Sequence, residues 1–325
     1  MNMNFKEIIA LAQDVIDKCG FLYSPNNLYE PIDYAMRMGG KRLRPSLLLL
    51  AADMYGAPLQ DVKDVAIAVE LYHNFTLLHD DLMDQSLVRR GKTTVYRKWN
   101  SNTAVLSGDA MFALSVKQLV SAHVANKDRV LEVFSRVALE VCEGQQLDMD
   151  FEQRDMVLME EYKEMIRLKT AVLLVGALEM GAFCGNAPAE DVELLQAIGT
   201  HLGYAFQMQD DLLDVYGNFD KFGKRQGQDI VDRKKTYMLL KAAEMLPEKD
   251  GRALSDMYSS HVLSDDVRVE RIMGLYDKLN LRSVVESDID SCLVQILPQV
   301  DKLHASAEGK TALSEFITSM RHREV

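Results

Sequence analysis

Two short acidic clusters hold the residues of this sequence that are best suited to chemistry. Residues 79–84 read HDDLMD and residues 210–214 read DDLLD, and each cluster lies in an apolar stretch. On a helix, side chains four residues apart lie on one face about 6 Å apart, and like charges at that spacing repel by roughly 0.2–0.5 kcal/mol. No Lys or Arg lies within four positions of either cluster to relieve this repulsion. A solvated acidic face would explain one such cluster, but two alike are better explained by a bound cation.

The ligands that these clusters offer are carboxylate oxygens, which hard divalent cations prefer. Mg²⁺ in particular keeps several waters and is held by one or two carboxylates together with substrate phosphates. Carboxylates in partly apolar surroundings also need a compensating charge. An EF-hand is a poor alternative, because its calcium loop alternates its ligands and needs a central glycine. The clusters therefore predict two facing acidic helices that hold metal ions.

Three basic segments supply candidate groups for binding phosphate. They read GGKRLRP (39–45), RRGKTT (89–94) and GKRQGQD…DRKKT (223–236), and the last two follow the acidic clusters closely. Arginine suits bidentate contacts to phosphate, and lysine acts as a point charge. Each segment alone would be an ordinary surface patch, but with the acidic clusters they suit phosphates bridged by metal and clamped by cations. Nucleic acid is disfavoured as a partner, since the net charge is −12 and the acidic clusters would repel its backbone.

Helices must position these groups. Apolar residues recur at helical spacing in NFKEIIALAQDVIDKCG (4–20), and RPSLLLLAADMYG (44–56) runs from a proline near its start to a glycine, as helices commonly do. Further helices are predicted over about 60–86, 101–125, 127–153, 159–182 and 188–216, with shorter pieces to the end. Only 7 prolines occur, and runs of alternating β-branched residues are lacking. We therefore predict an all-α protein with central helices that are apolar around much of their girth and, since no linker-like tract is seen, a single domain over residues 1–325.

The remaining composition indicates a protein of a reducing compartment. Hydrophobic residues make up 48% and charged residues 26% of the chain, as in ordinary globular proteins. The four cysteines lie far apart, without zinc-type spacing or a dense disulfide framework, so a cytoplasmic setting is expected. The first residues carry acids among their apolar side chains, unlike a secretory signal, and no stretch approaches about 18 uncharged apolar residues. No stable membrane insertion is therefore expected.

Five segments resemble, in order and spacing, the signature segments of the trans-isoprenyl diphosphate synthases, the polyprenyl synthetase family. They read GGKRLRP, LLHDDLMDQSLVRRGKTT, RLKTAVLL, GYAFQMQDDLLDVYG and GKRQGQDIVDRKKTY, and they span residues 39–237. The resemblance implies an all-α helical bundle around a deep central cavity, usually as a homodimer. It also implies that isopentenyl diphosphate is condensed head to tail with an allylic diphosphate (dimethylallyl, geranyl or farnesyl diphosphate). Pyrophosphate would be released with the help of Mg²⁺, expected as three ions.

The resemblance further implies a role for individual residues. The Mg²⁺ ligands would be Asp80, Asp81 and Asp84 in the first cluster and Asp210, Asp211 and Asp214 in the second. The allylic diphosphate would be held by Arg89, Lys169, Lys224 and Lys234, and isopentenyl diphosphate by Lys41, Arg44, His73 and Arg90. Thr170 and Gln207 would line the place where the allylic cation forms, and they join Asp80, Asp84, Asp210 and Lys169 in the catalytic set. From the residues alone, His73 would be taken for a satisfied core histidine.

The chemistry of such a reaction agrees with the residues. Breaking a C–O bond to give an allylic cation requires stabilisation of the leaving pyrophosphate, which Mg²⁺ and fixed cationic side chains supply in a dry, preorganised site. The apolar flanks of the clusters exclude water that would quench the cation. In the family the departing pyrophosphate accepts the final proton, so no side chain is expected to act as a general base.

Product length is expected to depend on what blocks the cavity below the first cluster. Thr76 lies one helical turn, about 5.4 Å, before Asp80, and Phe75 lies beside it. In the family, an aromatic residue at this place together with a compact motif such as DDLMD goes with short products. The common bacterial farnesyl diphosphate synthases carry two extra residues in this motif, which this chain lacks. Geranylgeranyl diphosphate (C20) is therefore favoured as the product, with farnesyl diphosphate (C15) next.

Other functions fit less well. A terpene cyclase also uses an aspartate-rich metal site, but it has no need of a second diphosphate pocket such as Lys41, Arg44, His73 and Arg90 would form. A metal-dependent phosphohydrolase would need several histidine ligands, and the chain has only 7 histidines and a single His–Asp pair. A non-catalytic regulatory subunit of a prenyl synthase would be free to lose carboxylates, yet both clusters are intact.

Overall fold

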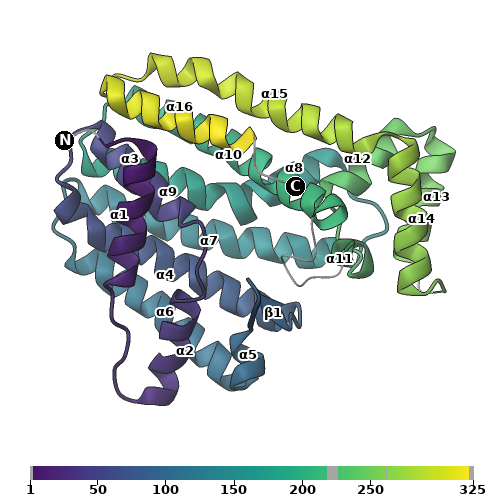
Figure 1. The fold of residues 1–325 in the computed structure, drawn as a ribbon, viewed down its shortest axis with the longest axis horizontal. Coiled ribbons are helices and arrows are strands. Elements are labelled where there is room, and N and C mark those ends of the chain that lie inside the picture. The colour runs from purple at the N-terminus through teal and green to yellow at the C-terminus, as the bar shows by residue number, and fades with distance from the viewer. Residues whose placement is uncertain (1–2, 218–225, 261, 322–325) are drawn as a thin grey trace. The chain divides into compact units, whose positions relative to one another are not determined.

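The computed structural model describes residues 3–217, 226–260 and 262–321. These residues fold almost entirely into helices, which confirms the all-α prediction (Figure 1). In chain order the elements are α1 (Phe5–Asp17), α2 (Asn26–Met36), α3 (Leu43–Met54), α4 (Leu59–Met83), β1 (Val88–Arg89), β2 (Lys92–Thr93), α5 (Val95–Lys98), α6 (Ser101–Ser121), α7 (Lys127–Glu152), α8 (Met159–Ile166), η1 (Arg167–Ala171), α9 (Val172–Cys184), α10 (Ala189–Tyr216), α11 (Gln228–Val231), α12 (Tyr237–Met245), α13 (Glu248–Ser259), α14 (Asp265–Lys278), α15 (Leu281–Lys302) and α16 (Ala307–Arg321). Within the described ranges, no helix has the length and apolar character needed to span a bilayer.

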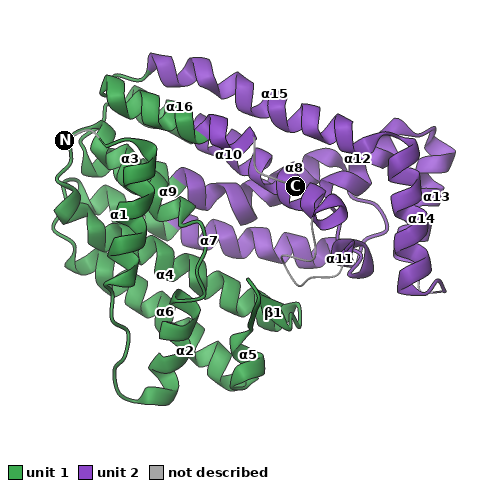
Figure 2. Cartoon of the chain, in the orientation of Figure 1, with its two compact units in different colours: residues 1–135, 176–196, 303–316 green, residues 136–175, 197–302, 317–325 purple. Residues whose placement is uncertain are grey.

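Two compact units divide the chain (Figure 2). Unit 1 comprises Met1–Ser135, Gly176–Gln196 and Leu303–Phe316, and unit 2 comprises Arg136–Val175, Ala197–Lys302 and Ile317–Val325. The boundaries fall inside α7, α9, α10 and α16, so neither unit is a continuous stretch of sequence. The first acidic cluster belongs to unit 1 and the second to unit 2. The single domain expected from the lack of linkers stays a prediction.

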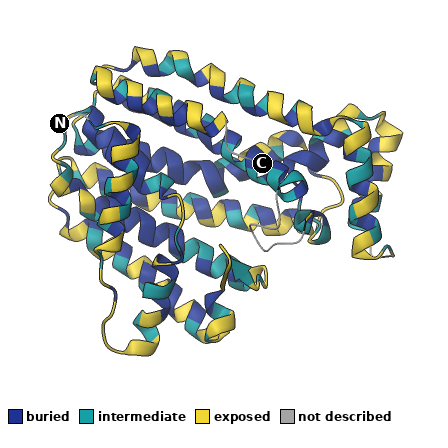
Figure 3. Ribbon diagram, in the orientation of Figure 1, coloured by how far each residue is buried: buried dark blue, intermediate teal, exposed yellow. Residues whose placement is uncertain are grey.

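Unit 1 is built around α4, which packs against α3 and α6. Every residue from Val65 to Asn74 is buried, because apolar side chains cover most sides of this stretch (Figure 3). A glycine lets a neighbouring helix approach closely: a Cβ atom at Gly181 of α9 would collide with the Leu48 carbonyl of α3. These helices have the apolar girth that was predicted for central helices. The polar residues buried within α4 must find partners inside the protein.

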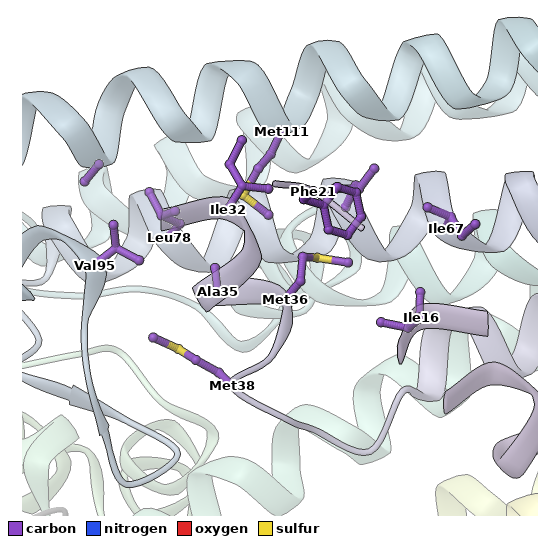
Figure 4. Close-up of a cluster of buried hydrophobic side chains, with 12 residues drawn as sticks. Ile16, Phe21, Ile32, Ala35, Met36, Met38, Ile67, Leu78, Val95 and Met111 are labelled. Atoms are coloured by element: carbon purple, nitrogen blue, oxygen red, sulfur yellow. The ribbon is translucent and has the colours of Figure 1, made fainter. Parts of the chain in front are cut away.

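A group of buried apolar side chains joins α1, α2, α4 and α6 within unit 1 (Figure 4). It includes Ile16 of α1, Met36 of α2, Ile67 of α4 and Met111 of α6. Full burial of one such side chain contributes about 1.5–3 kcal/mol relative to exposure. The group thereby fixes the end of α2, from which the chain enters the segment GGKRLRP that was predicted to bind phosphate.

Unit 2 contains a series of helices after the second acidic cluster, of which α15 is the longest. The buried residues of α15 recur every three or four positions: Leu281, Val285, Ile289, Leu293, Ile296 and Val300. With 22 residues, α15 is shorter than the helices that were predicted between residues 60 and 216, in keeping with the shorter pieces expected toward the end of the chain. Charged and polar residues separate these apolar positions, so the stretch lacks the dense apolar runs by which the earlier helices were recognised.

Two local features were not predicted from the sequence. β1 and β2 form an antiparallel hairpin in which Arg89 pairs with Lys92. The two turn residues, Arg90 and Gly91, have φ values of 52° and 73°, as a tight type I′ turn requires. The helix predicted over 159–182 is divided into α8 and α9 by η1, a π-helical turn of a kind that often occurs at functional sites.

Candidate active site

The first acidic cluster lies at the C-terminal end of α4. Asp80 and Asp81 occupy the last turn, and Asp84 is the C-cap residue, whose N–H donates to the Asp80 carbonyl at 2.8 Å. A helix C-terminus carries the negative end of the helix dipole, and α4 has no basic residue in its last turn. The second cluster repeats this arrangement, since Asp210 and Asp214 lie in the last two turns of α10, again without a basic residue in the last turn. In both places the local electrostatics favours a bound cation.

The middle aspartate of each cluster is turned into the protein. Asp81 and Asp211 are 4% and 3% exposed, whereas the aspartates that flank them are not buried. Neighbouring residues on a helix point about 100° apart, so a middle aspartate does not share the face of the pair that flanks it. The flanking pairs offer oxygen ligands only, a donor set that suits Mg²⁺.

The buried carboxylate of Asp81 is compensated by Arg89. Arg89 Nε donates to Asp81 Oδ1 at 2.8 Å, with the two side chains 26% and 5% exposed. The hairpin makes this contact, because β1 brings Arg89 back to the end of α4, and the Ser86 N–H donates to the Asp81 carbonyl on the way. The residue predicted to bind metal and the residue predicted to bind diphosphate therefore contact each other, and both roles stay predictions.

Asp211 is held by three donors within unit 2. Its Oδ2 accepts from the Tyr162 hydroxyl at 2.8 Å and from the Tyr237 N–H at 2.7 Å, and its Oδ1 accepts from Gln207 Nε2 at 2.8 Å. Burial nevertheless raises the pKa of Asp211 to about 6, against these hydrogen bonds, which favour the ionised form. Thr170 Oγ1 donates to Gln207 Oε1 at 3.0 Å. The two residues predicted to line the place of the allylic cation are thus joined to the second acidic cluster by a chain of hydrogen bonds.

The π-helical turn η1 carries Lys169 and Thr170. Two glycines make room for its backbone: a Cβ atom at Gly144 of α7 would collide with the Lys169 nitrogen, and one at Gly203 of α10 would collide with Ala171. The extra residue of a π turn shifts the side chains that follow it around the helix axis. Both the close packing and the shift set the direction in which Lys169 leaves the helix.

Asp148 of α7, which the sequence did not reveal, contacts two of the predicted site residues. Lys169 Nζ donates to Asp148 Oδ2 at 2.7 Å and Lys234 Nζ at 3.3 Å, and Lys234 also pairs with Glu152 at 2.5 Å. Burial raises the pKa of Asp148, but the two lysine charges outweigh burial and hold this pKa below its ordinary value. Asp148 therefore gathers two of the residues predicted to hold the allylic diphosphate. Gly144, one turn earlier, was the available signal, since a glycine inside a helix points to close packing.

His73 lies among arginine side chains. Arg44 Nη1 is 3.0 Å from His73 Nε2. Burial lowers the pKa of His73 well below its usual value, and the charges of Arg44, Arg90, Arg89 and Arg42 lower it further. The imidazole is therefore neutral, and because a guanidinium group can only donate, Nε2 is the acceptor and Nδ1 carries the proton. The structure thus gathers three of the residues predicted to hold isopentenyl diphosphate.

Gly40 of GGKRLRP makes room for Arg90. The Arg90 guanidinium group donates to the Gly39 carbonyl, and a Cβ atom at Gly40 would lie 2.6 Å from Arg90 Nη1. Gly40 also has a φ of 134°, which residues with a side chain rarely adopt. Lys41, the fourth residue predicted to hold isopentenyl diphosphate, is exposed. Lys224, predicted to hold the allylic diphosphate, lies outside the described residues.

Phe75, predicted to limit product length, belongs to an aromatic group. Its ring centroid lies 5.5 Å from that of Tyr72, 5.7 Å from that of Phe112 on α6 and 4.8 Å from that of His79. Thr76 Oγ1 donates to the His73 carbonyl at 2.9 Å. With its hydroxyl engaged in this way, Thr76 has only its methyl group left for packing against other groups. The neighbouring rings fix the orientation of Phe75, while its role in product length stays a prediction.

One further group of carboxylates and histidine, among the described residues, lies elsewhere in unit 1. The side chains of Glu190, Asp191 and His304 are close enough to share an ion. Asp191 is buried, and it accepts from the Tyr55 hydroxyl at 2.8 Å and from the His304 N–H at 2.8 Å. It also lies in the first turn of α10, where the helix dipole stabilises a carboxylate. Through these contacts the group connects α3, α10 and the segment before α16, which is a structural role. It contains none of the predicted metal ligands.

Known proteins similar to this chain point to one family. A family model described as Polyprenyl synthetase matches residues 25–275. The chain is 42% identical over 222 residues to a geranylgeranyl diphosphate synthase of Methanosarcina mazei, which covers 68% of each protein. It is 38% identical over 230 residues to a farnesyl diphosphate synthase of Bacillus subtilis, covering 68% of this chain and 77% of that protein. A crystal structure of a geranylgeranyl pyrophosphate synthase aligns over 100% of both chains with a TM-score of 0.91 and 38% identity.

Proposed function

Because the chain belongs to the polyprenyl synthetase family, we propose that it is a short-chain trans-prenyltransferase. It condenses isopentenyl diphosphate head to tail with an allylic diphosphate and releases pyrophosphate. The observation that supports the proposal most is that α4 carries two different kinds of group that can bind a diphosphate. The helix ends in carboxylates that suit a metal-bridged diphosphate, and about two turns earlier it carries His73 among arginines, which suits a diphosphate bound without metal.

Magnesium ions are expected at the two acidic clusters. Asp80, Asp84, Asp210 and Asp214 would be the main ligands, with Asp81 and Asp211 in support because their oxygens already accept hydrogen bonds. When bound, Mg²⁺ supplies positive charge that stabilises a departing diphosphate. Three ions are proposed, as the family implies.

The protein's own residues hold and orient the allylic diphosphate. Lys169 and Lys234 are both positioned by Asp148, and each supplies ammonium donors for diphosphate oxygens. Arg89 and Lys224 are proposed to add further positive charge. Such fixed cations act most strongly where water is excluded, and no reorganisation is needed when the C–O bond breaks.

The allylic cation must form in surroundings without water or another nucleophile that could react with it. The oxygens of Thr170 and Gln207 direct dipoles toward that place, and their mutual hydrogen bond keeps them fixed. Apolar residues next to the acidic clusters, such as Leu78 and Leu212, keep water away. No side chain is required as a base, since the departing pyrophosphate takes the final proton.

Isopentenyl diphosphate is proposed to bind Lys41, Arg44, His73 and Arg90. Neutral His73 keeps its Nδ1–H as a donor while its Nε2 orients Arg44. Because arginine binds phosphate in a bidentate manner, two arginines held by glycine packing and by His73 give both affinity and orientation. The carbon end of the substrate would then be presented to the allylic cation in a fixed direction.

Geranylgeranyl diphosphate is the proposed product, with farnesyl diphosphate next. Relatives named for each product are similarly close, at 42% and 38% identity, so similarity alone separates them little. The ring of Phe75, fixed by its aromatic neighbours, supports a short product because a rigid ring near Asp80 would limit the length of the growing chain.

A homodimer in the cytoplasm is the proposed state of the protein. The exposed face of α6 carries an apolar row: Val105, Leu106, Phe112, Val116 and Val120, 36% to 60% exposed. The helix has only Asp109 and Lys117 as charged residues, so a second copy of this acidic chain meets no net repulsion there. Exposed apolar rows of this kind are typical of interfaces. Four free thiols are consistent with a reducing compartment.

The test is condensation by the purified protein in the presence of Mg²⁺. Isopentenyl diphosphate is supplied with dimethylallyl, geranyl or farnesyl diphosphate, and the products are separated by chain length. Asp80→Asn and Asp210→Asn are expected to lose turnover by orders of magnitude, whereas Asp61→Asn, an exposed carboxylate near the start of α4, serves as a matched control. No condensation with any starter, or full activity of both cluster variants, contradicts the proposal.

A further inference from the structure

A buried carboxylate, Glu70, lies beside the residues proposed to bind isopentenyl diphosphate without being one of them. Glu70 belongs to α4, one helical turn before His73 and Asn74, and is 2% exposed. Arg42 Nη1 donates to Glu70 Oε1 at 2.5 Å, and Asn74 Nδ2 donates to the same oxygen at 3.0 Å. A buried charge requires such a partner, so Glu70 and Arg42 depend on each other.

Arg42 is fixed far more tightly than a surface arginine. Its side chain is 1% exposed, and it also donates to the Met36 carbonyl at 2.6 Å and to Gln13 Oε1 at 3.3 Å. Its backbone has a φ of 49°, in the left-handed region that residues with a side chain disfavour. The bonds of the guanidinium group, the one to Glu70 among them, therefore hold the chain in a conformation it would not favour alone.

The conformation of Arg42 determines how its neighbours in GGKRLRP are directed. Lys41 precedes it directly, and Arg44, two residues later, reaches His73 at 3.0 Å. Arg42 and Arg44 thus contact α4 one turn apart, at Glu70 and at His73. Arg42 is the N-cap residue of α3 and Arg44 lies in its first turn, so a change in the first contact would alter the start of α3 and thereby the second contact.

Glu70 also offsets the positive charge of this region. The four arginines that lower the pKa of His73 are close to one ring and repel one another: Arg42, Arg44, Arg89 and Arg90. Burial lowers the pKa of Arg90, and the charge of Glu70 acts against this effect. The negative charge of Glu70 reduces the electrostatic repulsion among these arginines, and it does so without replacing any of the cationic groups proposed to bind the substrate.

We propose that Glu70 is a positioning residue of the isopentenyl diphosphate site: it holds Arg42 and, through it, directs Lys41 and Arg44 toward the diphosphate. Glu70 itself does not touch the substrate. The inference rests on the proposed function, because it assumes that Lys41 and Arg44 bind isopentenyl diphosphate. It predicts that loss of the Glu70 charge weakens the binding of one substrate and leaves the other unaffected.

The experiment compares Glu70→Gln with the wild type in steady-state condensation of geranyl and isopentenyl diphosphates. The KM for isopentenyl diphosphate is expected to rise about tenfold or more, as for a misdirected charge-assisted hydrogen bond, while the KM for geranyl diphosphate changes less than about threefold. Arg42→Lys, which keeps the charge but loses the forked donor, is expected to show the same split. Glu179→Gln, which removes an equally buried carboxylate of unit 1 at 2% exposure, is the control for loss of stability alone.

The outcomes separate this inference from the proposed function. A wild-type protein that fails to condense the substrates overturns both. An active wild type whose Glu70→Gln and Arg42→Lys variants show unchanged KM values, or equal rises for both substrates, overturns the positioning role alone. If both variants fail to fold while Glu179→Gln folds, the pair serves stability, and the positioning role is likewise rejected.

Discussion

Replacing His73 by glutamine removes one titrating group while keeping an acceptor for Arg44. Burial and the neighbouring arginines lower the pKa of His73 well below 6.5, whereas in the unfolded chain the ring titrates at about 6.5. Below that pH the unfolded chain binds a proton that the folded chain does not. The stability contributed by neutral His73 is therefore present above about pH 6.5 and is lost as the pH falls.

The size of this effect follows from one proton. Each proton of difference between the folded and unfolded states changes the free energy of unfolding by about 1.36 kcal/mol per pH unit. With an unfolded pKa of about 6.5, the loss between pH 7.5 and pH 5.5 is at most about 1.4 kcal/mol, the limit for a folded ring that binds no proton in this range. Glutamine does not titrate, so the wild type should lose stability relative to His73→Gln over this range, by up to about 1.4 kcal/mol.

Urea unfolding of both proteins at several pH values measures this difference. His304→Gln provides a control of opposite sign, because the hydrogen bond to Asp191 and the charges of Glu190 and Asp191 raise the pKa of His304. Its contribution is present below about pH 6.5 and is lost as the pH rises through the folded pKa. A difference between wild type and His73→Gln that stays constant from pH 7.5 to pH 5.5 would refute the neutral, buried histidine.

Three further predictions concern product length, the lysine pair and assembly. Phe75→Ala is expected to lengthen the products by at least one isoprene unit, because it removes a fixed ring near Asp80; chromatography that shows an unchanged distribution would contradict this role. Asp148→Asn is expected to lower kcat about tenfold, roughly 1.4 kcal/mol, because two lysines lose their common partner, whereas Asp150→Asn, exposed on the same helix, should retain the wild-type rate. Leu106→Glu is expected to yield monomers in sedimentation experiments by placing a charge in the apolar row of α6, and a dimer of unaltered affinity would exclude that row as the interface.

The helices that carry the site could be predicted because burial imposes a local period on the sequence. The helix predicted over 127–153 is α7 (Lys127–Glu152), and the one predicted over 188–216 is α10 (Ala189–Tyr216). The shared direction of the flanking aspartates in each acidic cluster could be predicted as well, since residues four apart lie on one face of a helix. The same helix geometry explains why Asp81 and Asp211 are buried, because the middle aspartate of each cluster points away from the flanking pair.

Pairings between distant segments could not be predicted from local patterns. GGKRLRP looks like one basic segment, yet Arg42 is buried against Glu70 while Arg44 contacts His73. Which of these arginines binds a buried carboxylate depends on a residue 28 positions away. Asp148 was missed for the same reason: its lysine partners lie 21 and 86 positions along the chain. The π turn η1, too, depends on packing against glycines of other helices.

Pyrophosphate release tests most directly whether this protein joins two diphosphate substrates. Geranyl diphosphate and Mg²⁺ are supplied with and without isopentenyl diphosphate, and pyrophosphate and chain length are measured together. We expect release only when isopentenyl diphosphate is present, with one pyrophosphate for each isoprene unit added. Pyrophosphate released from geranyl diphosphate alone, or no release when both substrates are present, would contradict it.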